Sequence, residues 1–521
     1  METITIPSSE YEALKGEVAR LNQQVQWLME QMRLSKHRQY GASSEKSSYE
    51  QLSLFNEAEA TADANVAEPE LVEVERHYRK KKRESGDRLP ADLPVEVVEH
   101  DLPRDEQVCP ECGGDLHVMG RETRRELKLI PAKAVIVEHV RKVYACRDCE
   151  KDSCGVPIRK APMDEPVMKG IFASPEAVAY IMTQKFVMGA PLYRQEQDWN
   201  RYGVMLSRQT MSNWLIRCAE DYLAPIFEAL REIMLEYSPA LHADETTLQV
   251  LHEPDKTAQS KSCMWLYRTS GYNRHGIRMP MPITLYDYQP DKKAIRPEAF
   301  LKSYKGYLHT DGYAAYHSLP EDIIIVGCWA HARRKFTDAL KSMLEKDREG
   351  SGAFVGKQYC DKLFMLERQF TDLSPDERFL KRQEQAKPIL DEFHTWLNAQ
   401  HIVKNAFGQA LTYMLDQWKY LARYLLDGRL EISNNRAERS IKPFVISRKN
   451  FLFANTPRGA KASAVMFSII ETAKENGLNP YVYLSYIFRN APNWNIRNDL
   501  DRLQLLLPNS VPAFCKAIAD A

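Results

Sequence analysis

Five short β-rich runs in the middle of the chain constrain its fold more than any other feature of the sequence. Turn residues separate the runs, which are Leu248–Leu251, Cys263–Arg268, Ile283–Tyr286, Tyr307–Thr310 and Ile323–Val326. An aspartate lies at a strand edge in two places, Asp244 in the segment 241–246 and Asp311 in the segment 308–313. Either aspartate alone fits an ordinary turn, so their meaning depends on residues later in the chain.

A third acidic residue, Glu438, comes after a long helical stretch that runs to about Arg423. We expect Glu438 to lie on a helix capped by Asn434 or Asn435, because asparagine favours the N-cap position. Residues 430–461 hold seven basic and two acidic side chains, a net charge of +5. This balance predicts a phosphate-binding surface with a metal ligand inside it. The basic residues that we expect to contact DNA there are Arg436, Arg439, Arg448 and Lys449.

Two aspartates on adjacent strands and a glutamate on a later helix predict an RNase H-like catalytic core. Three carboxylates can hold two Mg²⁺ (or Mn²⁺) ions about 4 Å apart, because these ions prefer oxygen ligands. One ion activates a water or a DNA 3′-hydroxyl, and the other stabilises the leaving oxygen. Two other acids are weaker candidates. Glu245 should point to the opposite face of its strand from Asp244, and Glu431 precedes the helix cap.

A Cys-x-x-His sequence, Cys328 and His331, lies just beyond the last of the five runs. Two ligands alone do not make a closed zinc site. We therefore expect Cys328 to pack in the core and His331 to support catalysis by orienting a catalytic group or a phosphate. Arg333 and Arg334 come next on the same segment and are candidate DNA contacts.

Four of the ten cysteines form two C-x-x-C pairs, Cys109 with Cys112 and Cys146 with Cys149. Two such turns complete a tetrahedral site of four thiolates for one structural Zn²⁺. Between the pairs, residues 122–130 and 134–145 are expected to be extended strands that bring the cysteines together in a ribbon. The alternatives are a redox pair or a fortuitous spacing.

An apolar seam near the N-terminus predicts a coiled coil that assembles the chain into a homodimer or a higher oligomer. Its residues recur at alternating spacings of three and four and are Tyr11, Leu14, Val18, Leu21, Val25, Leu28 and Met32. The alternative is a helix that packs on its own chain. Residues 51–75 carry seven acidic and no basic side chains, which is typical of a linker, and the linker ends in a basic run at residues 79–83.

Residues 174–222 predict three helices that begin near Ser174, Pro191 and Ser207. A glycine turn before the third helix suits a helix-turn-helix. The side chains of that helix that would reach a DNA groove are Arg208, Gln209 and Asn213. An ordinary helical subdomain is the alternative.

At 521 residues the chain is long enough for roughly three or four domains. No stretch approaches the ~20 apolar residues that a membrane span requires, and residues 1–10 lack the apolar core of a signal peptide, so we expect a cytoplasmic protein without a membrane partner. We expect a multidomain α/β chain. Its parts are a coiled coil (1–50), a linker (51–100), a zinc-binding ribbon (101–165), a helix-turn-helix-like domain (166–235), the first part of the core (236–340), a helical insertion (341–428), the second part of the core (429–485) and a C-terminal tail (486–521).

The sequence resembles the transposases of bacterial insertion sequences in the family numbered sixty-six, often called TnpC. The resemblance spans nearly the whole chain, from the N-terminal seam and the paired cysteines to the catalytic region. The motifs that carry it are Tyr40-Gly41, Ser44-Glu45-Lys46, residues 242–246, 310–313, 328–334, 434–439 and 448–450.

The resemblance implies a DDE transposase with an RNase H-like core and a helical insertion before its glutamate. Matched residue by residue, the triad falls on Asp244, Asp311 and Glu438. Ser433 departs from the family pattern, which commonly has an aspartate before the two asparagines. The implied partners are DNA, both the transposon ends and the target, and possible accessory transposition proteins.

Three hypotheses are consistent with these features. The chain is an active transposase, or a DNA-binding protein whose acidic residues are relics, or a nuclease that cuts without rejoining. The presence of all three acids in fitting contexts favours the first over the second. Hydrolysis and strand transfer use the same metal ions, so the sequence does not separate the first from the third.

Overall fold

The structure is a computed structural model that describes residues 134–145 and 158–517. Near the N-terminus it also describes residues 12, 15–18, 20–22, 24, 25, 27–30, 32 and 33. The four paired cysteines, Tyr11, Leu14 and the linker 51–100 lie outside the described residues. The chain divides into two compact units, residues 1–42 with 138–518 and residues 43–137 with 519–521, and the described helices and strands belong to the first.

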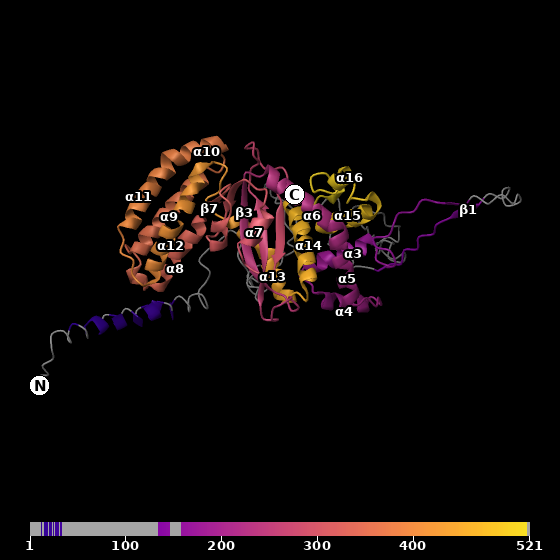
Figure 1. Ribbon diagram of the computed structural model, residues 1–521, viewed down its shortest axis with the longest axis horizontal. Coiled ribbons are helices and arrows are strands. Elements are labelled where there is room, and N and C mark those ends of the chain that lie inside the picture. Colours follow the sequence, from indigo (N-terminus) through magenta and orange to yellow (C-terminus); the bar gives the residue numbers. More distant parts are fainter. Residues whose placement is uncertain are drawn as a thin grey trace, which may run out of the picture. The chain divides into compact units, whose positions relative to one another are not determined.

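The centre of this unit is a five-stranded sheet with the strand order β5-β4-β3-β6-β7 (Figure 1). The strands are β3 (Ala240–Gln249), β4 (Lys261–Thr269), β5 (Thr284–Gln289), β6 (Gly306–His309) and β7 (Ile323–Val326). β3, β4 and β5 are antiparallel neighbours, whereas β3, β6 and β7 are parallel. All five predicted strand regions therefore belong to one sheet.

The position of Asp244 corrects the sequence prediction. Asp244 lies in the interior of β3 and not at a strand edge, because β3 already begins at Ala240. β4 pairs with β3 from Leu241 to Gln249, so the polar segment keeps its ladder of backbone hydrogen bonds. Thr246 and Thr247, which are β-branched, favour the extended backbone there.

Two helices that come after the insertion pack on the sheet. α13 (Asn435–Phe451) packs on β3 and β4, and α14 (Pro457–Glu475) lies along β5. The hydroxyls of α14 accept hydrogen bonds from the free N–H groups of this edge strand. Thr284 N donates to Thr472 Oγ1 at 3.0 Å, and Tyr286 N donates to Ser468 Oγ at 2.7 Å. The helix thus satisfies an edge that would otherwise be open to another strand.

The helices before the sheet begin where the sequence predicts. They are α3 (Pro175–Phe186), α4 (Leu192–Arg201), α5 (Arg208–Cys218), the π-helix Ala219–Leu223 and α6 (Ala224–Tyr237). Ser174 and Ser207 cap α3 and α5 by accepting hydrogen bonds from backbone N–H groups. Within the predicted range 166–235, these helices share one hydrophobic core with the sheet and α14. The ring contact between Phe186 and Phe467 is part of that core.

The residues after α14 are also packed and do not form the expected tail. α15 (Pro480–Trp494) packs against α3, and α16 (Leu500–Gln504) comes after it. The Tyr483 hydroxyl donates to the Leu506 carbonyl at 2.7 Å. The apolar side chains of Leu506 and Leu507 are buried, which accounts for the docking of this segment.

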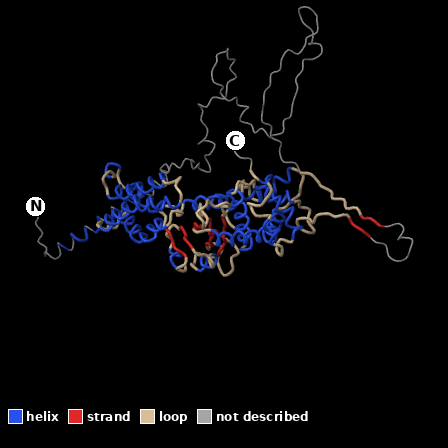
Figure 2. Tube along the Cα trace, turned by 90° about the horizontal axis from the view of Figure 1, so that it is seen from above, coloured by secondary structure: helices blue, strands red, loops and turns tan. Residues whose placement is uncertain are grey.

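The stretch between β7 and Glu438 is helical, as predicted. It begins with α8 (Trp329–Ser342), and the range 341–428 then contains α9 (Gly352–Gln369), α10 (Pro375–Lys381), the π-helix Arg382–Ala386, α11 (Lys387–Asn398) and α12 (Ala406–Leu421). These helices enclose a second core around Trp329 and Phe393. Figure 2 shows the strands of the sheet between this helical group and the group that contains α3–α6.

One buried arginine ties the insertion to the segment that leads to α13. Arg382 is fully buried and pairs with Glu367 at 2.7 Å. Its other N–H groups donate to the carbonyls of Tyr424, Asp427 and Leu430. These contacts fix the path of the chain just before α13.

Three further elements lie outside these groups. α7 (Ile295–Phe300) joins β5 to β6, and β1 (Val143–Ala145) pairs antiparallel with β2 (Ile158–Lys160). The strand expected at 134–145 is shorter than predicted, because only its last three residues have a strand partner. No described helix combines the length and the apolar composition that crossing a bilayer requires.

Candidate active site

The two aspartates lie side by side because their strands are parallel neighbours. His242 on β3 is in register with His309 on β6, and each aspartate comes two residues after its histidine. Residues two apart on a strand point to the same face. The two histidine rings stack with their centroids 4.4 Å apart. Asp244 therefore points to the same face of β3 as His242, and Asp311, just past the end of β6, lies close enough for its charge to raise the pKa of Asp244.

A buried asparagine places the third carboxylate. Asn434 precedes α13, and its Nδ2 donates to the Ala243 carbonyl at 2.7 Å while its Oδ1 lies 2.9 Å from His242 Nδ1. Asn434 is the N-cap residue of α13, as predicted, but its side chain makes no capping hydrogen bond, because it turns to β3. This contact fixes the start of α13 beside Asp244, and Glu438 lies one turn further along the helix.

The electrostatics of the site reflect how close the three carboxylates lie. The pKa of Asp244 is raised from 3.8 to about 7, first by burial and then by the charges of Glu245, Asp311 and Glu438. One carboxylate oxygen of Glu438, Oε1, is buried without a hydrogen-bond partner. Like charges gathered in this way raise a carboxyl pKa, and a bound cation relieves them.

The backbone around Asp311 is built for a tight turn. Its Oδ1 accepts a hydrogen bond from Tyr313 N at 3.0 Å, and its carbonyl accepts one from the Tyr413 hydroxyl at 3.1 Å. Gly312 has a φ of +92°, and a Cβ there would lie 2.9 Å from the side chain of Gln417. Only glycine fits this position without strain.

The two rival acids already have partners in the structure. Glu245 accepts hydrogen bonds from Lys292 at 3.2 Å and from the Tyr316 hydroxyl at 3.0 Å. Glu431 forms an ion pair with Arg436. Of these three glutamates, Glu438 is the one with a buried carboxylate oxygen, Oε1, that makes no hydrogen bond.

Three residues of the Cys-x-x-His segment lie around Glu438. His331 Nδ1 is 3.5 Å from Glu438 Oε1, and Arg334 Nη2 is 3.5 Å from Glu438 Oε2. Cys328 is fully buried, as expected. Burial lowers the pKa of His331, whereas the charge of Glu438 raises it. Arg333 points elsewhere and pairs with Asp361 at 2.5 Å.

Comparison with known proteins identifies the family of this chain. A sequence model described as "Transposase IS66 family" matches residues 170–462, more than half of the 521 residues. The chain belongs to the IS66 transposase family. Models described as "zinc-finger binding domain of transposase IS66", "Transposase C of IS166 homeodomain" and "IS66 C-terminal element" match residues 106–150, 27–98 and 468–508.

Two similar relatives come from Sinorhizobium fredii. The uncharacterized protein y4hP is 31% identical over 419 residues, which cover 77% of this chain and 72% of the relative. The uncharacterized protein y4jD is 29% identical over 439 residues, which cover 82% and 83%. Membership of the IS66 transposase family implies a divalent metal ion, zinc in the matched zinc finger, and DNA as the partner.

The basic residues of this IS66 transposase differ in how accessible they are. Arg436 pairs with Glu431, and Arg448 donates to Thr246 Oγ1 at 3.2 Å. Arg439 and Lys449 are exposed. Of the four predicted contacts on α13, the last two are therefore the more accessible to a phosphate backbone.

The helix-turn-helix candidates lie together on the exposed side of α5. Arg208, Gln209 and Asn213 are all exposed, and Gln209 Nε2 donates to Asn213 Oδ1 at 3.3 Å. The face that they form is free of the core residues Trp214 and Leu215.

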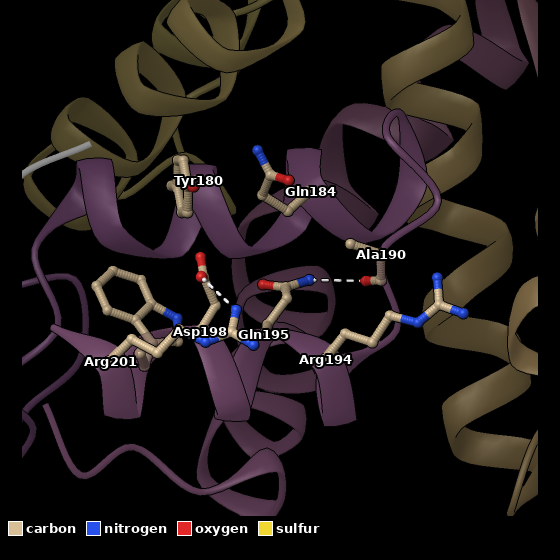
Figure 3. Close-up of a pocket in the computed structure, with 8 residues that line it drawn as sticks. Tyr180, Gln184, Ala190, Arg194, Gln195, Asp198 and Arg201 are labelled. Carbon is tan, nitrogen blue, oxygen red and sulfur yellow. Dashed lines mark hydrogen bonds and ion pairs between the residues drawn. The ribbon is translucent and has the colours of Figure 1, made fainter. Parts of the chain in front are cut away.

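A small hollow of about 210 Å³ lies between α3 and α4, away from the carboxylates. Figure 3 shows Gln195 turned toward Ala190, to whose carbonyl it donates at 2.9 Å, and Asp198 beside Arg201 at 3.4 Å. None of the residues that line the hollow belongs to the site around Glu438.

Sequence reasoning missed the residues that position the carboxylates. His242, His309 and Asn434 make the buried contacts between β3, β6 and α13. The sequence did carry a signal for the two histidines, because His-x-Asp occurs both at 242–244 and at 309–311. No local pattern pointed to the turn of Asn434 toward β3.

Proposed function

We propose that this IS66 transposase binds the ends of its insertion sequence and catalyses metal-dependent cleavage and transfer of DNA strands. The observation that carries the proposal is the convergence of Asp244, Asp311 and Glu438 from two parallel strands and one helix. Asp244 and Glu438 come from segments almost two hundred residues apart in the sequence, and packing alone gives no reason to gather three acids there.

The catalytic core is RNase H-like in this proposal. Support comes from the order of the five strands, in which β5, β4 and β3 are antiparallel neighbours and β6 and β7 continue the sheet parallel to β3. Further support comes from α13, which carries Glu438 and packs on β3. The helical insertion at 341–428 then separates the two parts of the core, 236–340 and 429–485. The core includes the helices at 166–235, because they share its hydrophobic interior.

The donor set fits Mg²⁺ or Mn²⁺. Asp244, Asp311 and Glu438 offer hard oxygen ligands, which these ions prefer. Burial and neighbouring acids raise the pKa of Asp244, and Oε1 of Glu438 is buried without a hydrogen bond, so a bound cation would stabilise both carboxylates. Two bound ions would activate the attacking hydroxyl and stabilise the leaving oxygen. Arg334 holds the second oxygen of Glu438, and His331 faces the first.

DNA contacts are assigned to the exposed cations. Arg439 and Lys449 on α13 would bind phosphates near the carboxylates, and Arg334, which contacts Glu438, would meet the strand at the reacting phosphate. The exposed residues of α5 would read the transposon end. The N-terminal seam would join two or more copies, because Val18, Leu21, Val25, Leu28 and Met32 are all exposed. We place this reaction in the bacterial cytoplasm, where target DNA is found.

The test is a strand-transfer assay with the purified full-length chain, Mg²⁺ and labelled DNA that carries the element's own ends. We expect cleaved ends and joined products. Asp244→Asn should abolish both, whereas the matched variant Glu431→Gln should retain them. His331→Ala should lower cleavage without unfolding the protein. Cleavage without joining would reduce the function to that of a nuclease, and end binding without cleavage in Mg²⁺ or Mn²⁺ would refute catalysis.

A further inference from the structure

Among the described residues, one group of side chains outside the aspartate pair has the composition of a transition-metal site. Its members are Cys328, His331 and Glu438, and one ligand atom from each lies within 4.8 Å of the other two. The sequence offers only the first two as neighbours. The fold adds the glutamate, which lies 110 residues after Cys328.

The Cys328 sulfur is buried beside a backbone donor. Asn434 N donates to Cys328 Sγ at 3.1 Å, and the side chain is fully buried. Burial raises the pKa of the Cys328 thiol to about 11, so a bound metal ion would have to displace the thiol proton. A thiolate is the form of cysteine that binds a metal ion.

The other two ligand atoms are buried and unpaired. His331 Nδ1 and Glu438 Oε1 have no hydrogen-bond partner, although they lie 3.5 Å apart. A tetrahedral ion with bonds of about 2.0–2.3 Å holds its ligand atoms about 3.3–3.8 Å apart. The 3.5 Å between Nδ1 and Oε1 matches such an ion, and Sγ, which lies within 4.8 Å of a ligand atom of each residue, would have to move closer by about 1 Å.

We infer that Cys328, His331 and Glu438 bind one Zn²⁺ or a similar borderline-soft divalent ion, and that this ion inhibits the proposed reaction by withdrawing Glu438 from Mg²⁺. The inhibitory part rests on the proposed function, whereas the binding part does not. Mg²⁺ rarely accepts sulfur and nitrogen ligands, so it should bind the three carboxylates, whereas zinc should prefer the site that contains Cys328 and His331. Binding releases the thiol proton to solvent and forms the zinc–sulfur bond.

The charges around the site are compatible with this ion. One thiolate and one carboxylate balance the two positive charges of the metal. Arg334 contacts the other carboxylate oxygen, Oε2, and its side chain is 43% exposed, so it leaves Oε1 open and is free to move. Three protein ligands leave a fourth position for water.

Zinc titration of the full-length chain tests the binding. The cysteine pairs near the N-terminus are first loaded with zinc, and additional Zn²⁺ is then titrated against a chromophoric chelator of known affinity. The wild type should bind one more zinc than Cys328→Ser. Asp244→Asn and Cys360→Ser should keep the additional zinc, because the first alters only the proposed Mg²⁺ site and the second removes a buried cysteine of α9.

Equal zinc binding by the wild type and Cys328→Ser would overturn the inference. So would loss of the additional zinc in Asp244→Asn, because the ion would then be bound by the aspartates. Serine keeps an acceptor for Asn434 N, and a thermal unfolding curve shows whether Cys328→Ser is folded. With Co²⁺ in place of zinc, the wild type should gain a sulfur-to-metal absorption band that Cys328→Ala lacks, which provides a second variant and a second readout.

The strand-cleavage assay in Mg²⁺ tests the inhibition. At a free zinc concentration about ten times the Kd, mass action leaves roughly a tenth of the protein free of zinc, so wild-type cleavage should fall about tenfold. Cys328→Ser should resist the same concentration. Equal inhibition of both proteins would refute the regulatory role. If no cleavage occurs in any condition, the proposed function fails, but the titration still decides whether the zinc site exists.

Discussion

Replacing Asp244 with asparagine should stabilise the folded protein in the absence of divalent ions at its active site. Asp244 is held among Glu245, Asp311 and Glu438, and burial and these charges raise its pKa from 3.8 to about 7. Folding therefore opposes its ionisation. Asparagine has no charge, and its side-chain oxygen still accepts the hydrogen bond that Glu245 N donates to Asp244 at 2.8 Å.

The magnitude comes from linkage between protonation and folding. An acid whose pKa is raised by folding does not lower the free energy of unfolding at low pH, where it is protonated in both the folded and the unfolded protein. The penalty grows as the pH rises from the unfolded value, 3.8, to the folded value of about 7, and it is complete above that. Three pKa units correspond to about 4 kcal/mol at 1.36 kcal/mol each. Since Asp244 is partly exposed, we expect a gain of roughly 2 to 4 kcal/mol at pH 8 and less than half of it at pH 5.

Urea unfolding of both proteins at pH 5 and pH 8, without Mg²⁺ and with the zinc retained, measures this gain. Asp347→Asn, at an exposed position, is the matched control and should change the free energy of unfolding by less than about 0.5 kcal/mol. Added Mg²⁺ should stabilise the wild type and not Asp244→Asn. A lower stability of Asp244→Asn at pH 8, or an equal gain at both pH values, would refute the reasoning.

The other predictions concern positioning, assembly, DNA binding and zinc. Asn434→Ala should lower the free energy of unfolding by about 1–3 kcal/mol, because it leaves buried partners unpaired, and should also slow cleavage; unchanged urea curves would contradict it. Deleting residues 1–40 should reduce the oligomer mass in light scattering, and an unchanged mass would show that the seam packs on its own chain. Replacing Arg439 and Lys449 with alanine should weaken DNA binding and flatten its dependence on log salt by about 0.9 per lost contact, whereas an unchanged slope would exclude phosphate contacts. Cys146→Ser should remove one zinc ion by elemental analysis, and full zinc content would argue against the ribbon.

Local signals in the sequence located most of the regular elements. The helices that begin at Ser174, Pro191 and Ser207 were predicted from capping residues, whose effect depends on neighbours only three residues away. The five strands were found from short runs of β-branched and aromatic residues between turns. Such features are encoded within a few residues, so a single sequence is sufficient to read them.

Packing between segments that are far apart in the sequence could not be predicted from such local patterns. The helices at 166–235 and the segment after 486 belong to the core of the sheet, which depends on side chains hundreds of residues away. The length of β3 depends on its pairing with β4 and β6, so its start at Ala240 was not visible locally. Resemblance to a family gave the triad, but it did not give the contact of Asn434 with β3.

The buried residues that position the carboxylates, His242, His309 and Asn434, are neutral. Neutral contacts suit a site whose net charge changes when a metal ion binds. Three acids repel one another before a metal binds, so their strands and helix must be held by contacts that do not depend on the metal. Burial lowers the pKa of both His242 and His309 well below the ordinary value, and their uncharged rings stack. A charged pair in the same place would change in strength whenever a metal ion arrived or left. We therefore expect the neutral stack, with Asn434 bridging β3 and α13, to hold the carboxylates in the same geometry with and without bound metal ions.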